Sequence, residues 1–213
     1  MLDIRNILFG VPITLIALTV HEFAHGWVST KLGDPTPRYQ GRLTLNPLAH
    51  LDVLGTILMI ITGFGWAKPV AINPNYYKDR KKGMALCALA GPLSNFLLAF
   101  FGMLIGYILL FVFARFNLPT EMLSTIIFVF AWRNLCFMVF NLIPLPPLDG
   151  FKVAGLFIPN SLYYNILRYE QYVVFAIMAL SLIGVFDSII GTGVNFFLRL
   201  IDRAVMALLG IFL

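Results

Sequence analysis

Long uncharged stretches separated by short polar segments dominate the pattern of this chain. The clearest stretch runs from Gly83 to Ala114 and, at about 1.5 Å per residue, is long enough to cross a bilayer as a helix. An earlier stretch, from about Arg5 to Lys31, contains Pro12 as a tolerable kink. A third begins near Thr120 and ends where three closely spaced prolines stop a helix. The pattern therefore predicts three transmembrane helices in the first two thirds of the chain.

Two further apolar segments follow. Gln171 to Phe186 is predicted to be a fourth, somewhat short span. Ser188 to Leu213 carries polar residues at roughly helical spacing, so it could lie in the interface as an amphipathic helix or cross with its polar face against the bundle. The pattern leaves both alternatives open. We predict an all-α polytopic membrane protein with about four to five transmembrane helices. Its single domain has a core at about residues 5–155 and C-terminal helices at about 168–213.

The segment between the first two spans does not read as a plain helix. Asp34-Pro35-Thr36-Pro37 breaks the chain, and the loose alternation from Tyr39 to Asn46 predicts a short strand. Val53 to Ala67 is uncharged but too short to cross comfortably, and it contains three glycines. We therefore expect a re-entrant or interfacial segment, with a short β segment, between the first two spans.

Composition supports the membrane interpretation. Hydrophobic residues make up 60% of the 213 residues and charged residues only 12%, about half the charged share of a soluble domain. The net charge of +5 comes from basic residues in loops, so we expect a lipid bilayer and no nucleic acid as partner. No signal-peptide pattern precedes the first span, so this span is expected to be retained. Cys87 and Cys136 lie in apolar stretches, which favours neither a disulfide nor a cysteine-based zinc site.

Loop charges predict the orientation. Only Arg5 and Arg115 flank the ends on one side of the bilayer, whereas the other side collects most of the basic residues. The positive-inside rule makes this second side cytoplasmic, in a multi-pass protein of the cell (inner or plasma) membrane. The basic residues on the cytoplasmic side are Lys31, Arg38, Arg42, Lys68, Lys78, Arg80, Lys81, Lys82, Lys152 and Arg168.

An ionisable motif lies inside the first span. His21-Glu22-Phe23-Ala24-His25 has the pattern H-E-x-x-H, which places both histidines on one helix face within reach of a single metal ion. Glu22 follows the first histidine, where its carboxylate can act as general base on a metal-bound water. The alternative is a pair of helix histidines beside a solvated glutamate. Three ionisable groups in hydrocarbon are costly and usually functional, so we favour the metal site.

A carboxylate is predicted to approach this motif from the third span. The proline-rich stretch from Asn141 to Gly150 ends that span, and the predicted topology brings Asp149 to the leaflet that holds His21 and His25. Two imidazoles and one carboxylate would leave one tetrahedral position open for water, which is the arrangement of catalytic rather than structural zinc sites. The expected active site opens toward the cytoplasmic side.

These motifs together resemble the site-2 protease family of intramembrane zinc metalloproteases. The resemblance is carried by His21-Glu22-x-x-His25, Gly91-Pro92-Leu93-Ser94-Asn95 and Asn141-x-x-Pro144-x-x-Pro147-Leu148-Asp149-Gly150. The stretch from Gly41 to Asp52 is similar to the compact prokaryotic branch. The family's large members have a span before the motif helix and a PDZ or CBS domain, for which this chain offers no room.

The resemblance implies a fold, a cofactor and a reaction. It implies a three-helix metalloprotease core in which His21, His25 and Asp149 bind one zinc ion and Glu22 activates water. The expected substrate is a membrane protein, cleaved within or near a transmembrane segment. Two other classes remain open, a membrane zinc-binding or transport protein and a catalytically silent scaffold of the same fold. The absence of internal repeats argues against a transporter, and the intact Glu22 argues against a scaffold.

Further polar residues are candidates with open alternatives. Asn95 or Asn141 could stabilise the oxyanion, or could instead form helix–helix hydrogen bonds. His50 is expected near the zinc without being one of its resting ligands, the alternative being an interfacial histidine bonded to a loop carbonyl. Asp52 could cap a helix or orient His50. Arg133, an intramembrane charge, could be functional, snorkel to the interface, or pair with Asp187 or Asp202.

Overall fold

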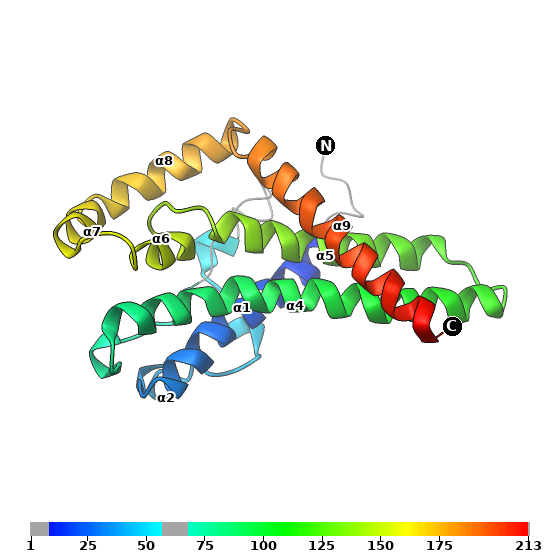
Figure 1. Cartoon of the computed structure of the whole chain (residues 1–213), viewed down its shortest axis with the longest axis horizontal. Coiled ribbons are helices and arrows are strands. Elements are labelled where there is room, and N and C mark those ends of the chain that lie inside the picture. Colours follow the sequence, from blue (N-terminus) through cyan, green and yellow to red (C-terminus); the bar gives the residue numbers. More distant parts are fainter. Residues whose placement is uncertain (1–8, 57–67, 213) are drawn as a thin grey trace.

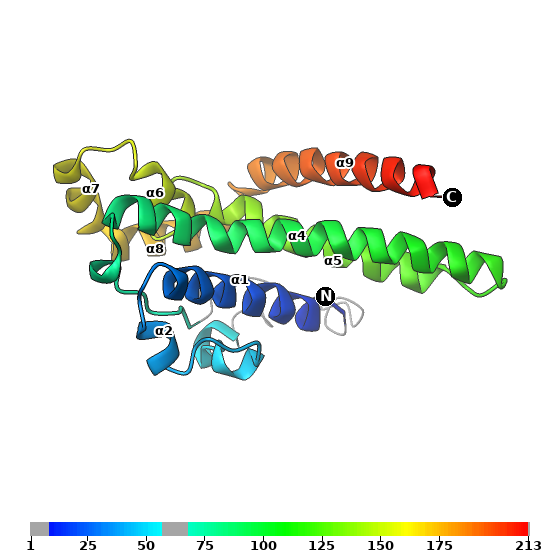
Figure 2. The same cartoon turned by 60° about the horizontal axis from the view of Figure 1, so that its bottom comes forward.

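A computed structural model describes residues 9–56 and 68–212, and within these ranges the protein is built from helices. Three long helices form its centre: α1 (Val11–Lys31), α4 (Arg80–Arg115) and α5 (Glu121–Asn141). Helix α4 packs against both α1 and α5, and the three lie side by side in both views (Figure 1, Figure 2). The predicted helical fold class is confirmed within the described residues, where these three helices form the centre.

Shorter elements surround this centre. Helices α6 to α8 lie at the end of α4 and α5 where α4 begins, and α9 runs back alongside the other half of the same pair (Figure 2). These elements are α2 (Thr36–Tyr39), η2 (Pro47–Ala49), η3 (Pro74–Tyr76), α6 (Asp149–Ala154), α7 (Asn160–Leu167), α8 (Glu170–Leu182) and α9 (Asp187–Phe212).

Small residues bring α4 and α5 close together. A Cβ added at Gly106 would lie 2.5 Å from Ile127 Cγ1, and one at Gly102 would lie 2.6 Å from the ring of Phe130. Ala99 and Ala131 are also completely buried in this contact. In a bilayer, where apolar burial gives no drive for association, such close backbone approach is how helices gain packing energy.

Two of the described helices, α4 and α5, are long and apolar enough to cross a membrane by length and composition. They coincide with the stretches predicted at Gly83 to Ala114 and from Thr120 onward. Many large apolar side chains of α4 are exposed, as expected of a helix that faces lipid. The apolar part of α8, Glu170–Ser181, is shorter. A total of four to five spans stays a prediction.

Helix α9 covers the outer part of the α4–α5 pair. Its residues Val194, Ile201 and Val205 are buried in the same apolar cluster as Met103 of α4 and Leu135 of α5. The stretch is thus a helix that buries these apolar residues on the bundle, while other apolar side chains, such as Phe196 and Leu200, are exposed. Whether it spans the bilayer or lies in the interface stays open.

The short strand predicted from Tyr39 to Asn46 is wrong. Tyr39 ends the short helix α2, and Gly41 adopts a positive φ of 65°, a conformation that turns the chain. The guanidinium of Arg42 then donates a hydrogen bond to the carbonyl of Ala49, and the Asn46 side chain caps η2. The segment therefore folds back on itself instead of pairing as a strand.

The re-entrant segment predicted at Val53 to Ala67 lies mostly outside the described residues. Its first residues form one helical turn, which Asp52 caps because its Oδ1 accepts a hydrogen bond from the Gly55 N–H at 2.9 Å. Of the two roles left open for Asp52, the structure shows the helix cap.

A buried polar cluster closes the C-terminal end of α1. The Asp34 carboxylate accepts hydrogen bonds from the Ser29 hydroxyl, from the Thr36 N–H and from the Asn73 N–H. Burial by itself would raise the pKa of Asp34, but these donors hold it below its ordinary value. The carboxylate therefore stays charged and ties the C-terminal end of α1 to the segment that precedes η3 and α4.

Candidate metal centre

Helix α1 presents two buried imidazoles on one face. His21 and His25 are one turn apart, and the centroids of their rings are 4.6 Å apart. Their Nε2 atoms are separated by 3.0 Å, so two protons cannot both lie between them. The i, i+4 spacing of the motif therefore produces the shared point of contact that the sequence predicted.

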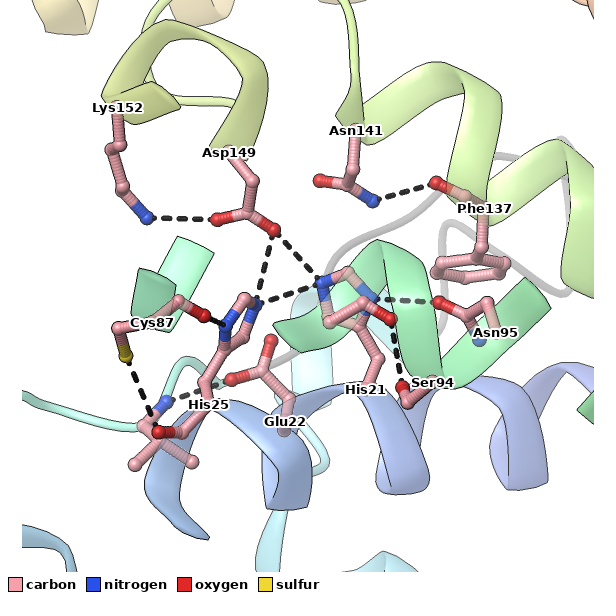
Figure 3. A network of polar contacts seen from close by, with 12 residues as sticks. His21, Glu22, His25, Cys87, Ser94, Asn95, Phe137, Asn141, Asp149 and Lys152 are labelled. Carbon is pink, nitrogen blue, oxygen red and sulfur yellow. Dashed lines mark hydrogen bonds and ion pairs between the residues drawn. The ribbon is translucent and has the colours of Figure 1, made fainter. Parts of the chain in front are cut away.

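The proline-rich turn after α5 brings Asp149 to the same point. Asp149 is the first residue of α6, and its Oδ2 lies 3.2 Å from His21 Nε2 and 3.0 Å from His25 Nε2 (Figure 3). The next residue, Gly150, packs directly on the end of α5, where a Cβ would lie 2.6 Å from the Ile143 carbonyl oxygen. Only a glycine permits this approach, which fixes where the carboxylate can sit.

Hydrogen bonds on the outer nitrogens orient both imidazoles. The Nδ1–H of His21 donates to Asn95 Oδ1, and the Nδ1–H of His25 donates to the Cys87 carbonyl, each at 2.7 Å. A protonated Nδ1 in a neutral imidazole leaves the Nε2 lone pair free. Both lone pairs are thus turned toward Asp149 by groups on α4.

Three acceptor atoms therefore converge on one buried point, and this arrangement fits a metal ion. Oδ2 of Asp149 is buried and has no hydrogen-bond donor among the described residues. It lies 3.0–3.2 Å from the two imidazole nitrogens. Two ligand atoms of a tetrahedral zinc ion are expected to lie about 3.3 Å apart, so these separations are close to that distance. Two nitrogens and one carboxylate oxygen are ligands that zinc commonly takes. His21, His25 and Asp149 could hold it.

Gly91 of α4 makes room for the two rings. A Cβ at this position would lie 2.5 Å from His25 Nε2 and 2.6 Å from His21 Nε2, closer than real Cβ contacts occur. The atoms that would be displaced are the same ones that converge on Asp149. The glycine of the Gly-Pro pair thus serves the metal centre directly.

Gly91→Ala is expected to weaken zinc binding by about 10- to 100-fold, the range for changes that misplace metal ligands without removing them. Competition with a chromophoric chelator measures the affinity. Gly102→Ala is the matched control, because its Cβ would press on Phe130 of α5 at 2.6 Å, away from the metal centre. Wild-type zinc affinity in a folded Gly91→Ala protein would contradict the close approach seen here.

Glu22 lies between the two histidines, on the helix that carries them (Figure 3). Its Oε2 accepts a hydrogen bond from the Val70 N–H at 2.9 Å. Val70 belongs to the stretch from Lys68 to Ile72, which has no helical or strand structure and crosses this part of the site. One carboxylate oxygen is thereby anchored by backbone, and the other remains for chemistry.

A chain of amides links the site to all three central helices. Asn95 accepts from His21, and its Nδ2 donates to the Ala17 carbonyl at 3.0 Å and to Asn134 Oδ1 at 3.2 Å. Asn134 in turn donates to the Phe130 carbonyl. Both asparagines are completely buried. With both N–H groups of Asn95 engaged, its geometry favours the helix–helix alternative over an oxyanion donor.

Asn141, the other oxyanion candidate, lies on the same side of the histidines as Asp149 (Figure 3). Its Nδ2 donates to the Phe137 carbonyl of its own helix at 3.0 Å. Reaching an oxyanion with this donor would therefore require the local bond to break or the second N–H to be used. The role of Asn141 stays a prediction.

His50 and Arg133 lie apart from the converging ligands. His50 is fully buried, its Nε2–H donates to the Thr44 carbonyl at 2.9 Å, and its Nδ1 has no partner among the described residues. The bond to a loop carbonyl matches the alternative given for it, and a functional role near zinc stays a prediction. The guanidinium of Arg133 lies beside Gly10 at the start of α1, and Asp202 instead accepts from Tyr107.

Sequence reasoning missed three residues of the site. Lys152 lies 3.1 Å from Asp149 through its Nζ, Gly91 gives the histidines their space, and Val70 anchors Glu22. Lys152 could have been found, because a lysine three residues after an aspartate faces it on a helix. Val70 gave no signal, since its contact uses backbone only.

Comparison with known proteins gives a consistent set of relatives. The model of the family described as "Peptidase family M50" matches residues 9–185. A Bacillus subtilis (strain 168) protein named "Putative zinc metalloprotease YwhC" is 38% identical over 179 residues, covering 80% of this chain and 79% of that protein.

Two more distant relatives carry similar names. "Putative zinc metalloprotease Rip2" of Mycolicibacterium smegmatis is 32% identical over 145 residues, 64% of this chain and 52% of that protein. "Putative zinc metalloprotease MJ0611" of Methanocaldococcus jannaschii is 33% identical over 138 residues, 62% of each chain. No solved structure matches the chain.

Proposed function

This chain belongs to peptidase family M50, the site-2 protease family of membrane proteins, and we propose that it is an intramembrane zinc metalloprotease. The observation that carries the proposal is the meeting of His21, His25 and Asp149, with Glu22 on the same helix turn, inside the central helix bundle. The zinc named for the relatives matches this donor set.

The residues divide the work of peptide hydrolysis. A zinc ion held by His21, His25 and Asp149 supplies a Lewis acid for the scissile carbonyl and a water of lowered pKa. Glu22 accepts the proton of the attacking water, whose oxygen bonds to the carbonyl carbon. When the C–N bond breaks, Glu22 returns that proton to the departing nitrogen. Asn95 holds His21 in the tautomer that this requires.

The place of the site along α4 supports a proposal for the substrate class. The imidazoles meet at Gly91, inside the uncharged stretch of α4, so the reaction would occur below the membrane surface. A peptide bond in a transmembrane helix is shielded by its own hydrogen bonds, so the substrate must unwind locally before attack. We propose membrane proteins with a transmembrane segment as substrates, cleaved within or near that segment.

Comparing membrane proteomes of cells that express the wild-type protein or Glu22→Ala tests this function. We expect full-length or membrane-retained forms of a small set of proteins to accumulate in the Glu22→Ala cells, because their cleavage would stop. Their cleavage sites should map within or next to transmembrane segments. Identical membrane proteomes under conditions where the protein is expressed would contradict the proposal.

We further propose that the active site opens toward the cytoplasm, on the side where the basic loop residues gather. In intact cells, an impermeant thiol reagent is expected to label a cysteine at position 115 and not one at position 78, because positive charge favours cytoplasmic loops. Both side chains are exposed, so accessibility from the protein itself does not bias the result. Labelling at 78 with protection at 115 would reverse the topology.

A further inference from the structure

The two oxygens of Asp149 have different partners. Oδ2 faces the two histidine nitrogens at 3.2 and 3.0 Å, whereas Oδ1 lies 3.1 Å from the ammonium nitrogen of Lys152 (Figure 3). The carboxylate is thus held from both ends. An ammonium group that donates a hydrogen bond to one carboxylate oxygen makes that oxygen less available to a metal ion.

The buried setting distinguishes this ion pair from an ordinary helix-surface pair. The side chain of Asp149 is 5% exposed and that of Lys152 32% exposed. Asp79 and Lys82 have the same i, i+3 spacing at the start of α4, yet their side chains are 50% and 77% exposed and their atoms lie 3.6 Å apart. Exposed pairs of that kind contribute little, whereas burying charges in a membrane protein is costly and usually functional.

The helix that carries Lys152 is fixed against its neighbours. Phe151 is 3% exposed, and its ring stacks on Tyr163 with centroids 5.1 Å apart and planes 6° from parallel. Gly150 is pressed against the end of α5. These contacts hold α6 from both sides, so Lys152 and Asp149 face the site together.

We propose that Lys152 is a positioning residue that keeps Asp149 a one-oxygen metal ligand and so leaves the fourth coordination position open for water. The inference rests on the proposed function only in requiring that a metal fill the centre. With Oδ1 held by Lys152, Asp149 offers the metal Oδ2 alone. Without the ammonium group, the carboxylate can turn and offer both oxygens, which fills the position that the reaction needs.

The charge of Lys152 also helps to keep Asp149 a one-oxygen ligand. Asp149 and Glu22 bring two negative charges to the site, and the two imidazoles are neutral when they bind metal. Lys152 is the cation that contacts these ligands in the described part of the chain. Its removal would strengthen the field of Asp149 at the metal and favour binding through both oxygens.

Metal binding by Lys152 variants tests the inference without any cleavage assay. Lys152→Met and Lys152→Ala are expected to bind zinc at least as tightly as the wild type, because Asp149 keeps its charge and can then offer both oxygens. When loaded with Co²⁺, they should lose visible absorption, because a higher coordination number weakens the d–d bands. Lys152→Arg should restore the wild-type spectrum, since a guanidinium can hold the same oxygen.

Lys82→Met is the matched control, because it breaks an Asp–Lys pair of the same spacing away from the site. It should bind Zn²⁺ and Co²⁺ as the wild type does. If Lys152→Met does not fold, Lys152→Ala, which likewise offers no donor to Oδ1, decides the matter. A wild-type Co²⁺ spectrum in the folded variant would overturn the role of Lys152. A wild-type protein that binds neither metal would instead overturn the proposed function.

Discussion

Replacing Glu22 by glutamine is expected to lower the rate of peptide cleavage by about 10²- to 10⁴-fold, the usual contribution of a general acid–base group. Glutamine has nearly the same shape and can still accept the hydrogen bond that the Val70 N–H gives to Glu22. It cannot take a proton from water at neutral pH. Since Glu22 is not among the three converging ligands, zinc content should stay at one ion per chain.

Cleavage of a reconstituted transmembrane substrate and metal analysis of the same preparations measure the two quantities. Glu121→Gln is the control, because Glu121 is exposed at the start of α5 and far along the chain from the motif. A Glu22→Gln protein that cleaves at the wild-type rate would remove Glu22 as the base. If the wild type binds zinc but cleaves nothing, the zinc-binding or scaffold alternatives gain support.

The parts of the fold that could be predicted from the sequence are those marked by a long continuous run of apolar residues or by a fixed helical spacing. The uncharged run from Gly83 to Ala114 became α4, and the stretch from Thr120 became α5, because uninterrupted apolar residues leave a membrane chain few choices but helix. The pairing of His21 with His25 was likewise determined by helix geometry alone. In each case one local rule sufficed.

Where several weak signals compete, the prediction failed. The alternation from Tyr39 to Asn46 is short, and a strand also needs a partner, whereas Gly41, with its positive φ, and the Arg42 side chain close the segment locally. The position of Asp149 could be predicted only to its leaflet. Its approach to within 3.0 Å of a histidine depends on Gly150 packing against the end of α5, which is a tertiary contact.

The amides illustrate a different limit. From sequence, Asn95 and Asn141 were equivalent candidates for the oxyanion, because both are polar groups in apolar helices. The structure separates them by their partners: Asn95 joins three helices and orients His21, whereas the bond that Asn141 forms in the described part of the chain is to its own helix. The hydrogen bond that fixes the tautomer of His21 goes to one asparagine and not the other because of how each helix is rotated in the bundle. A single sequence does not show that rotation.

Asp149→Ala is expected to weaken zinc binding by about 10²- to 10³-fold. Zinc sites with four protein ligands bind with about 10–16 kcal/mol, so each ligand contributes roughly 3 kcal/mol, and 1.4 kcal/mol corresponds to a factor of ten. The variant leaves the two histidine nitrogens in place, because Asn95 and the Cys87 carbonyl still orient them. It removes the one anionic oxygen that faces both. Chelator competition and metal analysis give affinity and stoichiometry, with Asp79→Ala as the control for loss of an aspartate paired to a lysine at i+3.

Unchanged affinity and stoichiometry in Asp149→Ala would remove Asp149 from the ligand set. The contacts of 3.0 and 3.2 Å to the histidines would then be ion pairs of the apoprotein rather than the outline of a zinc site.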